Sequence, residues 1–157
     1  MRSNEHFMQM AIETTKQGIA AGQTPFGAVI VSRRKVVGAA HNTVWRDSDP
    51  TAHAEVNAIR LAASLLATID LAGCTMFTTC EPCPMCLSAV HWSKIDRVVY
   101  GASIEDAARA GFSELRVGAA ELARMGGSEL VVEPGPLREE CRALFDLWKS
   151  HNASGAY

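Results

Sequence analysis

The sequence alternates short β-branched runs with longer segments of helical periodicity, and this alternation restricts the possible folds most strongly. Residues 5–21 repeat apolar side chains at helical spacing, whereas residues 26–31 form the continuous apolar run of a buried strand. Further strands are predicted at 36–42, 74–79, 97–101 and about 129–132, and further helices at 52–67, 85–94 and 137–149. A polar, alanine-rich stretch lies between the last two strands, and Thr51 is the expected cap of the second helix. The pattern predicts an α/β fold with a mixed sheet and helices on both faces.

Length and composition describe one compact domain spanning residues 1–157. The chain is 48% apolar and 20% charged, and no apolar run reaches the roughly 18 residues that a membrane-spanning helix requires. The first ten residues carry acid and amide groups where a secretory signal needs an apolar stretch, so we expect a cytoplasmic protein.

The charge balance favours a small ligand over a nucleic acid. Fifteen basic residues face seventeen acidic ones, which gives a formal net charge of −2. Proteins that bind nucleic acid usually carry a basic excess, because neutralising phosphates dominates their affinity. The one tight basic cluster, residues 33–35, is expected to be an exposed turn.

Two short motifs, each at the predicted start of a helix, hold residues with metal-binding chemistry. The first is His53-Ala54-Glu55 and the second is Pro82-Cys83-Pro84-Met85-Cys86. Unpaired N–H groups at a helix start lower the pKa of a thiol, and the thiolate is the form that binds metal. One histidine and two cysteines leave the fourth position of a tetrahedral zinc ion open to water, as in catalytic zinc sites. We therefore predict that His53, Cys83 and Cys86 bind Zn²⁺.

Glu55 is the residue that points to catalysis. A carboxylate beside a zinc site can accept a proton from water and pass it to a leaving amine. A Cys-x-x-Cys pair alone is often a structural zinc clip or a redox pair, and a His-x-Glu pair alone carries little weight. Their combination, His-x-Glu followed by Pro-Cys-x-x-Cys, is the pattern of zinc enzymes that deaminate nucleobases. The other three cysteines are expected to be buried apolar residues.

With these motifs the chain resembles the cytidine deaminase superfamily and, within it, the bacterial guanine deaminases. The resemblance rests on Asn42 and on residues 25–31, 49–56, 80–86 and 110–112. It implies a three-layer α-β-α sandwich with a five-stranded sheet, a homodimer, and one zinc ion per subunit.

The resemblance also implies the roles of several residues toward a purine base. Asn42 would hydrogen-bond the base, Phe26 would pack on its face, and Glu114 would contact it and help in proton transfer. Tyr157 would close the site, in some members from the other subunit. We also consider Trp92, on the helix after the cysteines, as a substrate-binding residue, with packing in the core as the alternative. The chain departs from the guanine branch after residue 112, where it has Ser-Glu in place of two acids.

Guanine is the expected substrate, and three alternatives remain at this stage. A deaminase specific for cytosine or for a nucleoside would use the same metal site with a different pocket wall. A tRNA adenosine deaminase shares both motifs, but it should present a basic surface. A zinc domain that serves only for interaction would not require Glu55.

Overall fold

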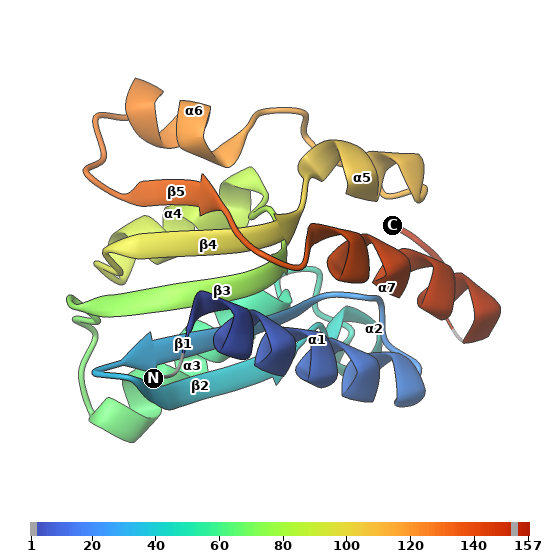
Figure 1. The fold of residues 1–157 in the computed structure, drawn as a ribbon, viewed down its shortest axis with the longest axis horizontal. Helices are drawn as coiled ribbons and strands as arrows, with labels where there is room; N and C mark the ends of the chain where they lie inside the picture. Colours follow the sequence, from blue (N-terminus) through green and yellow to red (C-terminus); the bar gives the residue numbers. More distant parts are fainter. Residues whose placement is uncertain (1–2, 152–153) are drawn as a thin grey trace.

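The computed structural model describes residues 3–151 and 154–157, so residues 1–2 and 152–153 of the predicted domain lie outside the described residues. Its centre is one sheet with the strand order β2-β1-β3-β4-β5. The strands are β1 (Gly27–Ser32), β2 (Lys35–His41), β3 (Cys74–Cys80), β4 (Arg97–Ala102) and β5 (Val131–Pro134). β1 pairs antiparallel with β2 and β3, whereas β3–β4 and β4–β5 pair in parallel. Helices cover both faces (Figure 1), so the predicted mixed five-stranded α-β-α fold is confirmed.

One face of the sheet is covered by α1 (Asn4–Ala20) and α7 (Arg138–His151). Because successive side chains of a strand point to opposite faces, alternate residues of the central strands meet these helices. Val29, Phe77 and Val99 lie in the same buried cluster as apolar residues of α1 and α7. The helical periodicity of residues 5–21 is thus the pattern of a helix with one buried face.

The opposite face is covered by α3 (Ala54–Leu66) and α4 (Pro84–Trp92). The face of α3 that meets the sheet consists largely of alanines, which lets the helix lie close to the strands. Gly38 of β2 makes the close approach possible, because a Cβ atom there would lie 2.6 Å from the carbonyl oxygen of Ala58. The small side chains therefore place the start of α3 next to the edge of the sheet.

The structure adds short helices that the sequence patterns do not reveal. These are α2 (Val44–Asp47), α5 (Ile104–Arg109) and α6 (Ala119–Met125). α5 and α6 divide the alanine-rich stretch between β4 and β5 (Figure 1). α5 begins with a capping box in which Ser103 and Asp106 satisfy each other's backbone N–H groups.

The predicted cap of the second helix is wrong. α3 begins at Ala54 and its N-cap is His53, whereas the backbone N–H and hydroxyl of Thr51 both donate to Asp49 Oδ1, at 2.8 and 2.7 Å. The Thr51 hydroxyl is therefore used in the preceding turn. This shift places a metal-ligand candidate at the N-cap of the helix.

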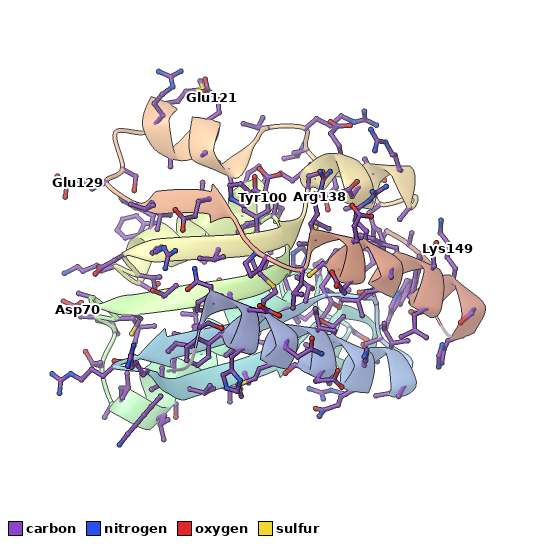
Figure 2. The ribbon with its side chains drawn as sticks, in the orientation of Figure 1. Asp70, Tyr100, Glu121, Glu129, Arg138 and Lys149 are labelled. Carbon is purple, nitrogen blue, oxygen red and sulfur yellow. The ribbon has the colours of Figure 1, made fainter. Side chains whose placement is uncertain are left out.

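Most charged side chains lie on the outside of the described part of the molecule, with Glu55 and Asp106 among the buried exceptions. Asp70, Glu121, Glu129 and Lys149 are exposed and project from the rim of the ribbon (Figure 2). Within residues 3–151 and 154–157, none of the helices combines the length and apolar character needed to cross a bilayer.

Candidate active site

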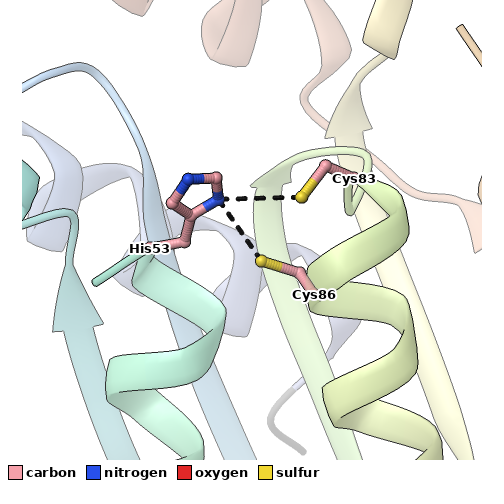
Figure 3. A group of neighbouring side chains, drawn as sticks. All are labelled: His53, Cys83 and Cys86. Carbon is pink, nitrogen blue, oxygen red and sulfur yellow. Dashed lines mark hydrogen bonds between the residues drawn. The ribbon is translucent and has the colours of Figure 1, made fainter. Parts of the chain in front are cut away.

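The two sequence motifs meet where α3 and α4 begin. His53 is the N-cap of α3 and Cys83 is the N-cap of α4, with Pro84 in the first turn of α4. His53 Nδ1 lies 3.7 Å from Cys83 Sγ and 3.5 Å from Cys86 Sγ, and the three side chains point toward one another (Figure 3). All three ligand atoms lie within 4.8 Å of one another. One imidazole and two thiols gathered in this way suit the ligand preferences of zinc.

The surroundings of Cys83 favour the metal-binding form of its thiol. The hydrogen bond with Cys86 lowers the pKa of Cys83 to about 4, against the opposing effect of burial. His53 also lowers this pKa. The N-terminal position on α4 adds the favourable field of unpaired backbone N–H groups. Cys83 is therefore ready to act as a thiolate ligand.

Glu55 is the second residue of α3 and lies buried beside the ligand group. Its Oε1 accepts a hydrogen bond from Thr78 Oγ1 at 3.4 Å, and its Oε2 lies 3.5 Å from Cys86 Sγ, which donates to it. Burial raises the pKa of Glu55, and the negative charge of Cys83 adds to the rise. A carboxyl group with a raised pKa exchanges its proton more readily near neutral pH, which is what a proton carrier requires.

A cavity of about 260 Å³ opens beside this group. His53, Cys83 and Glu55 line it together with Phe26 and ten further residues. These are Pro50, Cys80, Glu81, Pro84, Met85, Phe112, Ser113, Glu114, Leu115 and Tyr157. The cavity therefore brings together two of the metal-ligand candidates, His53 and Cys83, and three of the predicted substrate-binding residues.

Aromatic rings form one wall of the cavity. The centroid of the Phe112 ring lies 4.9 Å from that of Phe26 and 5.7 Å from that of Tyr157, both in edge-to-face geometry. The Tyr157 ring also lies 6.1 Å from the His53 ring. Offset and edge-to-face contacts of this kind hold rings in place and present an apolar surface to a flat ligand.

Asn42 reaches the cavity through Tyr157. The Asn42 side chain is buried, and its Oδ1 accepts a hydrogen bond from the Val44 N–H at 3.0 Å. Its Nδ2 donates to the Tyr157 hydroxyl at 2.6 Å. The Asn42 amide is thereby held in one orientation, with its donor directed toward the cavity-lining tyrosine.

The C-terminal segment lies at the cavity of its own chain. The Ser113 N–H donates to the Tyr157 carbonyl oxygen at 3.0 Å, and Trp45 Nε1 donates to the Gly155 carbonyl oxygen at 3.1 Å. These bonds join the end of the chain to α2 and to the segment after α5. A closing residue from the same chain is thus present in this structure.

Glu114 lines the cavity, whereas Trp92 does not. Burial raises the pKa of Glu114 to about 7, and the negative charges of Cys83 and Glu55 add to the rise. Trp92 ends α4 with 81% of its surface exposed and lines a separate groove between α4 and α6. The structure therefore does not bring Trp92 to the other predicted site residues.

Sequence reasoning missed several residues at this site, and Glu81 is the most informative of them. Glu81 lies two residues before Cys83 and lines the cavity, yet in the sequence it is only one acid among many within a metal motif. Pro50 and Met85 line the cavity close to the motif residues, and Trp45 reaches the site through its bond to Gly155, but sequence reasoning assigned none of them a role. An acid directly before Pro-Cys was the one local feature that could have identified Glu81.

Comparisons with known proteins agree with this geometry. Residues 1–102 match the family of the cytidine and deoxycytidylate deaminase zinc-binding region. A guanine deaminase of Bacillus subtilis is 44% identical over 113 residues, which are 71% of this chain and 72% of that protein. A tRNA-specific adenosine deaminase of Aquifex aeolicus is 41% identical over 98 residues, or 62% of this chain and 65% of that protein.

Structural comparison extends the similarity to nearly the whole chain. The solved structure of a guanine deaminase from Nitrosomonas europaea superposes with a TM-score of 0.86 at 30% identity, covering 96% of this chain and 86% of that one. Sequence match, fold and the grouping of one histidine with two cysteines all lead to the same class of enzyme. The chain therefore belongs to the cytidine and deoxycytidylate deaminase family and is a zinc-dependent deaminase.

Proposed function

We propose that this enzyme hydrolyses guanine to xanthine and ammonia. The observation that carries the proposal is the cavity beside the metal ligands, whose wall combines the Phe26 and Phe112 rings with polar groups at Glu114 and at the Asn42–Tyr157 pair. Guanine is a flat ring whose edge carries both hydrogen-bond donors and acceptors, so it needs aromatic faces and polar groups of both kinds. The similarity to guanine deaminases supports the same substrate.

The protein's own residues divide the reaction between binding and proton transfer. His53, Cys83 and Cys86 would hold zinc, and a zinc ion there would supply a water molecule that ionises at about pH 7. Glu55 would carry the two protons of the attacking water in turn. The first goes to a ring nitrogen as the new C–O bond forms, and the second goes from the resulting hydroxyl to the amine as the C–N bond breaks, so that guanine and water become xanthine and ammonia. Phe26 packs on the ring.

Asn42 and Glu114 bind the edge of the base. The Asn42 donor, which meets the Tyr157 hydroxyl in this structure, turns to an acceptor of the base when substrate is present. With a pKa of about 7, Glu114 supplies either an acceptor or a donor near neutral pH.

A tRNA substrate is the second candidate, because tRNA adenosine deaminases are similar to this chain over about three-fifths of its length. The charge at the cavity favours a free base. Glu55, Glu81 and Glu114 line it, and none of the lysines and arginines that the structure describes does so. A bound anticodon would bring phosphates to the cavity mouth. The affinity of a protein for nucleic acid depends on basic side chains that neutralise such phosphates.

We also propose that the enzyme acts as a homodimer, as the resemblance implies. The outer surfaces of the neighbouring helices α3 and α4 expose large apolar side chains, including Leu61, Leu65 and Trp92. Exposed apolar side chains of this size can be buried by association between copies. Light scattering at micromolar concentration tests this, and a monomer would contradict it.

The substrate is tested by offering zinc-loaded protein a panel of guanine, cytosine, adenine, guanosine, cytidine and ammeline, together with a tRNA anticodon stem-loop. Ultraviolet absorbance and ammonia release report deamination of each. We expect rapid turnover of guanine and little turnover of the nucleosides or the RNA. Deamination of another ring with guanine untouched would contradict the proposed substrate while leaving the zinc chemistry intact, and inosine in the RNA would favour the second candidate.

A further inference from the structure

The Glu81 carboxylate makes two hydrogen bonds that join separate parts of the site. Its Oε2 accepts from the Ile104 N–H at 3.0 Å, and its Oε1 accepts from the Ala119 N–H at 2.8 Å. Ile104 is the first residue of α5 and Ala119 is the first residue of α6. The Glu81 backbone N–H in turn donates to the Ala102 carbonyl oxygen at 2.7 Å, at the end of β4. One side chain, two residues before a metal-ligand candidate, therefore holds both ends of the stretch from 104 to 119.

This stretch needs external support because its second half has no regular structure. Residues 112–118 lie between α5 and α6 without helix or strand, and they include Glu114. They are anchored by the buried Phe112 ring, the bond from Ser113 N–H to the Tyr157 carbonyl oxygen, and the Glu81 carboxylate beyond their C-terminal end. An exposed ion pair between Arg116 and Glu105 also joins them to α5. Ionised acceptors form stronger hydrogen bonds than neutral ones, which suits a carboxylate to this task.

We propose that Glu81 is a positioning residue for deamination: its carboxylate holds the segment that carries Glu114 at a set place relative to Cys83 and the metal group. Because Glu81 belongs to the loop that carries Cys83, any change in its two hydrogen bonds alters the distance between Glu114 and the metal ligands. A displacement of about 1 Å in such a group can cost about 100-fold in rate. The proposal rests on the proposed function only in taking Glu114 to contact the substrate.

The variant Glu81→Gln tests this with almost no change of volume. A glutamine keeps one oxygen acceptor, but its amide N–H₂ cannot accept from the second backbone N–H. We expect kcat/KM to fall about 10- to 100-fold, with one zinc per chain retained. The matched control is Glu121→Gln, which removes the same charge from an exposed ion pair with Arg124 within α6 and should leave kcat/KM unchanged.

A double-mutant cycle with Glu114→Gln separates positioning from a general loss of structure. If Glu81 acts through Glu114, then Glu81→Gln should cost less than about threefold in the Glu114→Gln background. An equal loss in both backgrounds would overturn the proposal. Loss of zinc from Glu81→Gln would also overturn it, since Glu81 would then act through Cys83.

Hydrogen exchange gives a readout that does not depend on the identity of the substrate. In zinc-loaded Glu81→Gln we expect faster amide exchange across residues 113–119, with unchanged exchange in α3. Unchanged amide exchange in residues 113–119 would refute the positioning role of Glu81 even if guanine proves to be the substrate. If the enzyme prefers another base, the cycle is measured on that base, so failure of the guanine assignment remains distinguishable from failure of this proposal.

Discussion

The substitution Glu55→Gln separates the chemical role of this residue from its structural one. Glutamine has the same shape, so it leaves no cavity, and its carbonyl oxygen can still accept the hydrogen bond from Thr78 Oγ1. Burying a charged carboxylate costs free energy, and burial raises the pKa of Glu55 for this reason. A neutral amide avoids that cost, so we expect the thermal midpoint of the zinc-free variant to equal or exceed that of the unsubstituted protein.

Catalytic activity should fall, although thermal stability is kept or increased. Removing a positioned proton carrier typically costs 10²- to 10⁴-fold in rate. At about 1.36 kcal/mol per factor of ten, this is roughly 2.7–5.4 kcal/mol of lost transition-state stabilisation. Steady-state kinetics on the preferred base, zinc analysis and thermal unfolding measure the three quantities. Glu121→Gln is the control, because Glu121 is an exposed residue of α6 that pairs with Arg124 on the same helix.

The result that would refute this reasoning is specific. A Glu55→Gln enzyme with one zinc per chain and a kcat/KM within tenfold of the original value would show that Glu55 does not carry the proton. Loss of zinc together with loss of activity would instead show that Glu55 supports the metal ligands.

Three further predictions concern stability and metal binding. Burial opposes ionisation of Asp106, but hydrogen bonds from Ser103, followed by the charges of Arg142 and Arg138, lower its pKa. Its stabilisation is therefore present above about pH 4 and is lost as the pH falls through the lowered folded-state pKa. Asp106→Asn should lower the free energy of unfolding by about 1–3 kcal/mol at pH 7 but much less at pH 3. Urea unfolding at both pH values measures this, and equal losses at the two pH values would contradict it. Gly101→Ala should destabilise the protein by about 1–3 kcal/mol in the same assay, because the new Cβ would overlap Cys141 Sγ and lie 2.6 Å from Cys141 Cβ. An unchanged urea midpoint would show that α7 can move away. Cys86→Ala should reduce bound zinc well below one per chain by elemental analysis, whereas Cys74→Ala, a change at a buried cysteine outside the ligand group, should not.

The sequence by itself determined the elements whose information is local. The five strands and the long helices follow from side-chain periodicity, because a buried face repeats every two or about 3.6 residues. The metal-ligand candidates follow from the spacing of His53 to Glu55 and of Cys83 to Cys86, each within one turn at the start of a helix. Short helices such as α2, with four residues, are too short to show a period and depend on tertiary contacts for stability.

Only the tertiary structure decided which distant residues share the site. Asn42 and Tyr157 are 115 positions apart, and their hydrogen bond exists because α2 and the end of the chain meet at the same edge of the sheet. Trp92 was a reasonable candidate from its place after the cysteines, yet the turn of α4 directs it to the surface. Glu81 showed no special character until the fold brought the first residues of α5 and α6 to its carboxylate. Periodicity and motif spacing are properties of neighbouring residues, whereas contacts across loops depend on how the whole chain packs.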